Sequence, residues 1–149
     1  MNVEVQVEIN GTKEDVWKVI TDIENSTDTI RGIEKIEVLE KPTDSFVGLK
    51  WRETRTMFGR TATEVMWITD AIENQSYKTR AESHGAVYVT TLKITDAGKN
   101  VRLSMNFEGT PQTFGAKIMS ALTSGMAKKA TEEALMHDLM DIKAKVENK

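Results

Sequence analysis

Three charged side chains stand out because an alternating pattern places them on faces that are otherwise apolar. Glu53 and Arg55 share one face of segment 47–57, and Glu64 lies on the matching face of segment 60–71. Burying a carboxylate is costly unless a cation or a hydrogen bond satisfies it. An acid held in this way tends to bind a proton, a water molecule or a ligand, so these residues are the first candidates for chemistry.

The register of the two segments decides how these charges meet. If residues 58–59 form a two-residue hairpin turn, Glu53 faces Glu64 and Arg55 faces Ala62. Two carboxylates directly opposite one another repel, and Arg55 is placed to neutralise one of them. Two interpretations follow: a water-filled structural ion network near an open rim, or a group that orients a ligand or transfers a proton.

Two inward tyrosines, Tyr77 and Tyr88, are further candidates because a hydroxyl can hydrogen-bond a ligand. The alternative for each is a core tyrosine whose hydroxyl is satisfied by the backbone. Methionine side chains suit either an irregular core or a pocket that accepts varied apolar shapes. Five methionines are candidates for such a lining: Met57, Met66, Met105, Met119 and Met126.

Other kinds of site lack the residues they need. The chain has no cysteine, which removes thiolate nucleophiles, sulfur ligands and disulfides and fits a reducing cytosol. His84 and His137 have neither a second histidine nor a carboxylate at metal-ligand spacing. Ser120, Thr123 and Ser124 on the last helix have no adjacent His–Asp pair, and no phosphate-binding glycine loop occurs. We therefore expect no metal, no cofactor and no recognisable catalytic residue, and a cytoplasmic protein.

Length and composition are those of an ordinary globular domain. The 149 residues are 39% hydrophobic and 29% charged, and the net charge is −3. Basic residues are interspersed with acidic ones, so a nucleic-acid partner is not expected. No stretch approaches the roughly 20 apolar residues needed to span a bilayer. The sequence predicts one domain over residues 1–149, as a monomer or a weak homodimer.

The elements that must position the candidate residues follow from periodicity. Residues 3–9 alternate apolar with polar side chains, which predicts a strand. Gly11 ends it, and residues 12–15 (Thr-Lys-Glu-Asp) are close to a capping box at the start of a helix. The apolar stripe of that helix consists of Val16, Trp17, Val19, Ile20 and Ile23. A second short helix can follow within residues 24–29.

A period of two returns between residues 32 and 108. It predicts six strands, at residues 33–40, 47–57, 60–71, 76–83, 86–95 and 101–108. The turns between them are short, so consecutive strands should pair antiparallel. The outer face should carry an apolar patch, which is either a dimer surface or covered by other segments. The patch consists of Val65, Trp67, Val87 and Val89.

The pattern changes for the last time at residues 109–111. Thr110 can cap a helix, and Pro111 suits its first position. The predicted helix runs nearly to Asn148, with an apolar stripe of Phe114, Ile118, Leu122, Met126, Leu135, Leu139, Ile142 and Val146. The predicted fold class is therefore α+β: a seven-stranded curved antiparallel sheet wrapped around a long C-terminal helix, with one or two short helices after the first strand.

Three stretches resemble the START-like (SRPBCC) superfamily, most closely its polyketide cyclase/dehydrase branch. They are residues 7–22 (VEINGTKEDVWKVITD), residues 47–55 (VGLKWRETR) and the strand at 64–70. The pair Val16-Trp17 followed by an aspartate in the first helix is characteristic of that superfamily. The resemblance covers nearly the whole chain and implies the helix-grip fold.

The resemblance also implies a cavity between the concave face of the sheet and the C-terminal helix. Its wall would consist of Trp51, Glu53, Arg55, Glu64, Met66, Tyr77, Tyr88, Met105 and Phe107. Its lid would come from the long helix and consist of Phe114, Ile118, Met119 and Leu122. At residues 26–31 the aromatic-rich segment that is usual in the family is replaced by STDTIR.

Three functions remain open. The first is binding of a small hydrophobic ligand, lipid-like or polyketide-like, which needs no catalytic group. The second is a polyketide cyclase or dehydratase in which Glu53, Arg55 and Glu64 orient the substrate and move a proton. The third is a protein-interaction co-factor that acts through the outer face around Trp67. The sequence favours them in this order, so we expect a ligand-binding protein rather than an enzyme.

Overall fold

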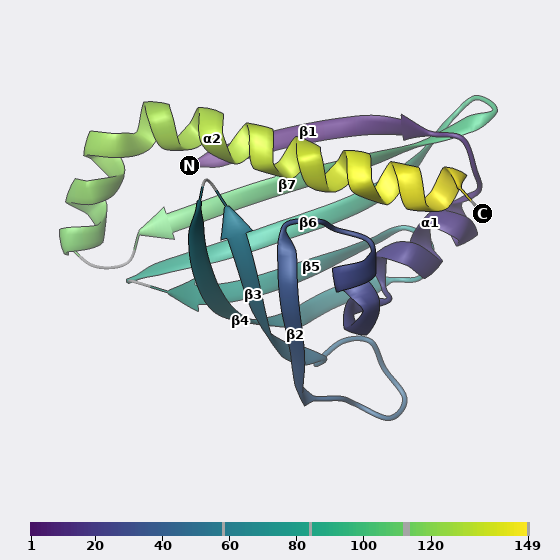
Figure 1. Cartoon of the computed structure of the whole chain (residues 1–149), viewed down its shortest axis with the longest axis horizontal. Coiled ribbons are helices and arrows are strands. Elements are labelled where there is room, and N and C mark those ends of the chain that lie inside the picture. Colours follow the sequence, from purple (N-terminus) through teal and green to yellow (C-terminus); the bar gives the residue numbers. More distant parts are fainter. Residues whose placement is uncertain (58, 84, 112–113, 149) are drawn as a thin grey trace.

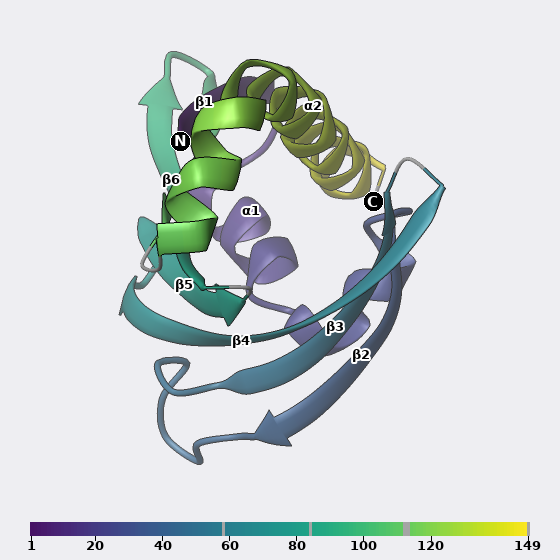
Figure 2. The ribbon, with the colours of Figure 1, turned by 90° about the vertical axis from the view of Figure 1, so that its left-hand side faces the viewer.

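Seven alternating segments build one antiparallel sheet, which curves around the helices (Figures 1 and 2). In this computed structural model the strands lie in the order β1-β7-β6-β5-β4-β3-β2, so β1 and β2 form the edges. The structure describes residues 1–57, 59–83, 85–111 and 114–148, and at 57, 60 and 114–127 it describes the backbone alone. The predicted α+β helix-grip architecture is confirmed.

The elements alternate in the order that periodicity predicts. They are β1 (Asn2–Ile9), α1 (Lys13–Ile20), the 3-10 helix η1 (Ile23–Asp28), β2 (Ile33–Glu40), β3 (Lys50–Met57), β4 (Arg60–Ile72), β5 (Ser76–Ser83), β6 (Ala86–Ala97), β7 (Asn100–Pro111) and α2 (Phe114–Glu147).

The first helix begins with the predicted capping box. The Thr12 hydroxyl accepts a hydrogen bond from the Asp15 N–H at 3.1 Å, and the Asp15 carboxylate accepts one from the Thr12 N–H at 3.2 Å. Two N–H groups that the helix itself cannot pair are thereby satisfied. α1 then continues into η1, which is the second short helix expected within residues 24–29.

The hairpin between β3 and β4 has the predicted register. Glu53 is paired with Glu64, and Arg55 with Ala62. Gly59 in the turn has φ of +73°, a left-handed conformation that favours glycine. The charged residues predicted to point inward therefore do lie on the same stretch of the inner face.

The third strand begins later than predicted. β3 starts at Lys50, and Val47 lies in the preceding loop with 38% of its surface exposed, so the predicted start of the strand at residue 47 is wrong. Gly48 has φ of +96°, which interrupts the extended chain before the strand. Its N–H donates to the Ile68 carbonyl at 2.9 Å, so the loop is joined to β4 all the same.

The start of the last helix was also predicted wrongly. Thr110 and Pro111 do not begin a helix, because they pair with Val87 and Ala86 and extend β7. β1 pairs with β7 as far as Glu108, and Gly109 exchanges hydrogen bonds with Met1, so within the described chain no strand pairs with this side of Thr110 and Pro111. Such an unpaired side tolerates a proline, which has no N–H to donate.

The second half of α2 is held on the sheet by apolar and polar contacts. Leu139, Ile142 and Val146 are at most 3% exposed and belong to the main core. Lys143 Nζ donates to the Glu8 carbonyl at 2.8 Å and so ties the helix to β1. Among the described residues, no helix is long and apolar enough to cross a membrane.

The outer apolar patch is not covered by the helices. α1, η1 and α2 all lie on the concave side of the sheet (Figure 2). On the opposite face Val65, Trp67, Val87 and Val89 are each partly buried. Lys50 Nζ lies 5.8 Å from the Trp67 ring centre, a cation–π contact that partly shields the indole.

Candidate functional site

A cavity of about 550 Å³ lies between the concave face of the sheet and the helices. The strands bring the nine predicted wall residues together around it: Trp51, Glu53, Arg55, Glu64, Met66, Tyr77, Tyr88, Met105 and Phe107. This convergence follows from strand alternation. Residues two apart along a strand lie on the same face of the sheet, and residues paired on adjacent strands share that face. The contribution of each to ligand binding stays a prediction.

The predicted lid cannot be placed in the same way. The side chains of Phe114, Ile118, Met119 and Leu122 lie outside the described residues, as do those of Met57 and Met126. Met66 and Met105 are the two predicted lining methionines that the structure does place, and both border the cavity.

The helices contribute lining residues that the sequence analysis missed. These include Ser26, Thr29 and Ile30 from η1 and the loop after it, and Ala130, Thr131, Ala134, Leu135, Asp138 and Ile142 from α2. A signal for Asp138 was present in the sequence. It stands three residues after Leu135 and four before Ile142, so it falls on the inward stripe of the helix.

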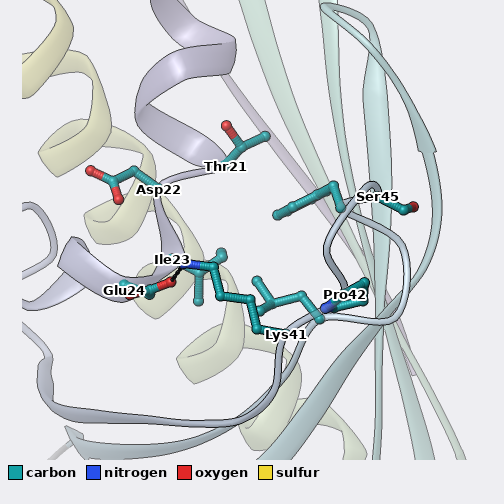
Figure 3. Close-up of a pocket in the computed structure, with 9 residues that line it drawn as sticks. Thr21, Asp22, Ile23, Glu24, Lys41, Pro42 and Ser45 are labelled. Atoms are coloured by element: carbon teal, nitrogen blue, oxygen red, sulfur yellow. Dashed lines mark hydrogen bonds and ion pairs between the residues drawn. The ribbon is translucent and has the colours of Figure 1, made fainter.

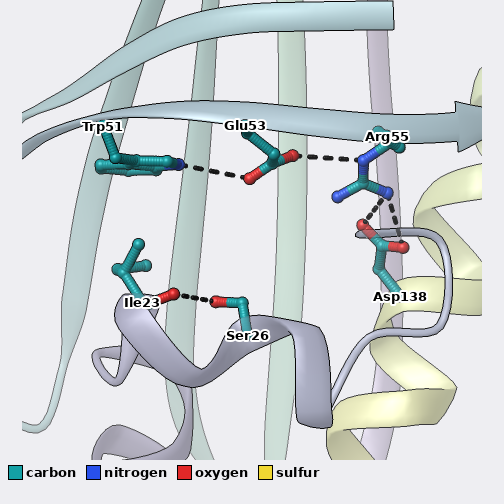
Figure 4. Close-up of polar contacts among 6 residues, drawn as sticks. All are labelled: Ile23, Ser26, Trp51, Glu53, Arg55 and Asp138. Atoms are coloured by element: carbon teal, nitrogen blue, oxygen red, sulfur yellow. Dashed lines mark hydrogen bonds and ion pairs between the residues drawn. The ribbon is translucent and has the colours of Figure 1, made fainter. Parts of the chain in front are cut away.

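A chain of polar contacts runs along one wall of the cavity and links β3 to α2 (Figure 4). Trp51 Nε1 donates to Glu53 Oε1 at 3.3 Å, and Arg55 Nε donates to Glu53 Oε2 at 3.2 Å. Arg55 Nη1 donates to both carboxylate oxygens of Asp138 at 2.9 Å. Arg55 therefore forms ion pairs with two acids, Glu53 and Asp138, and not with Glu64.

Burial and the charges of neighbouring groups together set the ionisation of this cluster. It raises the pKa of Asp138, and the charge and hydrogen bonds of Arg55 act against that shift while Glu53 adds to it. Burial would by itself lower the pKa of Arg55, but Asp138 and Glu53 outweigh it and the pKa is raised. Burial and then the Glu53 carboxylate raise the pKa of Tyr77. Arg55 is thus a fixed cation held between two carboxylates.

Glu64 has a different environment from Glu53. Its side chain is partly buried and borders the cavity directly opposite Glu53 in the hairpin. Within the described part of the chain, no hydrogen bond or ion pair reaches its carboxylate. The charge network thus holds Glu53 and leaves Glu64 available to whatever occupies the cavity.

The two inward tyrosines, Tyr77 and Tyr88, also have different environments. The Tyr77 hydroxyl donates to the Ile20 carbonyl at 2.9 Å, so it is satisfied by the backbone as the alternative interpretation holds. Tyr88 is partly buried and stacks on Phe107 with ring centres 5.5 Å apart. Both rings border the cavity, which makes the wall aromatic near β6 and β7.

A second, smaller pocket of about 240 Å³ opens beside η1 and the loop between β2 and β3 (Figure 3). Lys41 and Glu24, which both line it, form an ion pair. Ile23 borders both this pocket and the large cavity and is 7% exposed. The small pocket has less than half the volume of the large cavity and a more polar lining, so the large cavity is the candidate site.

Comparison with known proteins assigns the family. A sequence model described as "Polyketide cyclase / dehydrase and lipid transport" matches residues 1–147. The chain belongs to this family. This is the polyketide cyclase/dehydrase branch that the residues around the first helix indicate.

Solved structures share the fold over nearly the entire chain. The protein TTHA0849 from Thermus thermophilus is 15% identical, with a TM-score of 0.82 and coverage of 99% of this chain and 98% of that one. A START superfamily protein from Mycobacterium smegmatis is 18% identical, with a TM-score of 0.79 and coverage of 99% and 97%. The Zhui aromatase/cyclase from a Streptomyces species is 15% identical, with a TM-score of 0.77 and coverage of 99% and 94%. A search of curated proteins finds no match.

Proposed function

We propose that this chain binds one small hydrophobic molecule in the large cavity. The observation that carries the proposal is the cavity itself, about 550 Å³ in volume with a wall that is mostly apolar. Sites for small molecules fall in the range of roughly 300–1,000 Å³ and combine apolar walls with a few polar groups. The proposal treats residues 1–149 as one domain.

The apolar residues of the wall contribute mainly affinity, and the polar residues contribute mainly orientation. Met66, Leu92, Met105 and Phe107 offer apolar surface, whose burial against a ligand is favourable at about 25 cal/mol per Å². Polar groups on such a wall contribute orientation more than affinity, because their own desolvation offsets what they gain. No covalent chemistry is needed for this function.

Filling the cavity tests the proposal. The probe is N-phenyl-1-naphthylamine, a neutral fluorophore whose emission rises in apolar surroundings. We expect it to bind the wild-type protein with one site per chain. Ala134 borders the cavity from α2, so Ala134→Trp should weaken probe binding at least about tenfold, a change of roughly 1.4 kcal/mol.

The matched control is Ala144→Trp. Ala144 lies on the same helix but is exposed and does not border the cavity. It should bind the probe like the wild type. Equal binding by all three proteins would place the probe elsewhere and contradict the proposal.

A cyclase or dehydratase is the second candidate, and the observation that favours it is the Glu64 carboxylate, which borders the cavity and has no hydrogen bond or ion pair to another described residue. A general base needs a free carboxylate facing the substrate, as this one faces the cavity. The likeness to an aromatase/cyclase structure supports this candidate through the fold alone. An enzyme would lose turnover of a poly-β-keto substrate in Glu64→Gln while keeping its affinity for the neutral probe.

A further inference from the structure

The described polar residues of the cavity wall carry more negative than positive charge. Among its described residues the acids are Glu53, Glu64 and Asp138, and Arg55 is the cation. Arg55 is bonded to both Glu53 and Asp138, so these three groups together keep one negative charge. Glu64 adds a second one, directly opposite Glu53 in the hairpin.

This imbalance matters because the charges are withdrawn from bulk water. Glu53 is 7% exposed and Asp138 is 7% exposed, and charge interactions strengthen as solvent is excluded. A ligand carboxylate in the cavity would meet like charges on the wall. Among the described residues no acceptor is bonded to Arg55 Nη2, but the charge of Arg55 is already shared by two acids. A cationic ligand group would instead offset the excess.

Glu64 is the group best placed to receive such a cation. Its neighbours two residues away on the same face of β4 are Ala62 and Met66, which offer it no hydrogen bond. A partly buried carboxylate that no described residue pairs with is costly to desolvate, and an ammonium group would supply both a charge and hydrogen-bond donors.

We propose that the ligand of this cavity is an apolar amine whose protonated nitrogen is bound by Glu64, and that the cavity discriminates against carboxylates such as fatty acids. The inference rests on the proposed function, because it names the class of molecule that the cavity holds. The apolar wall binds the hydrocarbon part, and the net charge of the polar wall selects the head group.

Three competitors of equal chain length test the head-group preference: decylamine, decan-1-ol and decanoate. Each displaces N-phenyl-1-naphthylamine from the wild-type protein at pH 7, where the amine is protonated and the acid is ionised. We expect the amine to compete best, the alcohol next and the carboxylate worst, with at least about tenfold between the extremes.

Glu64→Gln isolates the residue, because it keeps the shape of the side chain and removes its charge. The variant should bind decylamine about tenfold more weakly than the wild type does, while its affinity for decan-1-ol should change by no more than about twofold. Retained alcohol binding shows at the same time that the variant is folded. The control Glu108→Gln removes a charge from an exposed position at the β1 end of the sheet and should leave all three competitors unchanged.

The outcomes separate the inference from the function it rests on. If the wild-type protein binds the probe but the carboxylate competes as well as the amine, the head-group inference is wrong and the binding function stands. If Glu64→Gln weakens the amine no more than Glu108→Gln does, Glu64 is not the receiving group and the inference fails. If the probe does not bind the wild-type protein at all, the proposed function fails first.

Discussion

Asp138 shows how one side chain can join two layers of the fold. It occupies a position on the inward stripe of α2 that an apolar residue could fill, and it binds Arg55 of β3 across the edge of the cavity. Breaking a buried ion pair by removing one partner commonly costs about 3–5 kcal/mol, although the intact pair adds little net stability. The pair therefore fixes the position of α2 more than it stabilises the fold.

The pH dependence of stability tests the environment of Asp138. Its pKa is raised above the ordinary value of 3.8, so the folded protein holds this proton more tightly than the unfolded chain does. The stability that this group contributes is complete below pH 3.8 and is lost as the pH rises through the raised pKa. Asp138→Asn lacks the titration, so the wild type should gain stability relative to the variant as the pH falls.

The measurement is the free energy of unfolding in urea for both proteins from pH 7 to pH 3. Acids far from Asp138 titrate alike in the two proteins and cancel in the difference. A difference that stays flat, or that favours the wild type as the pH rises, would show that Arg55 rather than burial controls the ionisation of Asp138.

Alternation in the sequence was enough to predict how Glu53 and Glu64 meet. A two-residue turn and a period of two fix both the face and the register, because an error of one residue would turn every side chain around. The partner of Arg55 could not be predicted in that way. It comes from a helix more than 80 residues away in the chain, and strand parity carries no information about that contact.

The short helix α1 closes one end of the cavity, and its position depends on how it begins. Val19 and Ile20 border the cavity, and the Ile20 carbonyl accepts the hydrogen bond from Tyr77. The capping box at Thr12 fixes the first turn of α1. It therefore also sets the direction in which the helix leaves the end of β1.

Thr12→Ala tests this cap. Loss of a capping threonine typically costs about 1 kcal/mol, because the Asp15 N–H loses its partner. The free energy of unfolding in urea should fall by that amount. Thr43→Ala, in the exposed loop between β2 and β3, is the control and should change it by less than about 0.5 kcal/mol. Equal effects of the two changes would contradict a role for the cap.

Element boundaries were predicted well where the local signal was unambiguous and poorly where it was shared. The capping box at residues 12–15 has one meaning, and α1 begins where it predicts. Thr110 and Pro111 are ambiguous, because a threonine–proline pair suits either the start of a helix or a strand with one unpaired side. Pairing with β6 decided between them, and that pairing is not visible in the local sequence.

The hollow between sheet and helices is a property of the assembled fold. The curved sheet packs against α2 along Leu139, Ile142 and Val146, and next to this contact the cavity separates the strands from the helices. Alternation predicts which side chains face inward, but it does not predict whether they touch. The cavity was expected from the likeness to the family, and the structure gives it a volume and the aspartate from α2.

Native mass spectrometry of the protein purified from its own host tests the central claim most directly. If the cavity holds a small hydrophobic molecule, the wild-type protein should carry one such molecule per chain, and Ala134→Trp should lose it while Ala144→Trp keeps it. A wild-type protein that shows only the mass of the bare chain, or an adduct that all three proteins retain equally, would contradict the account.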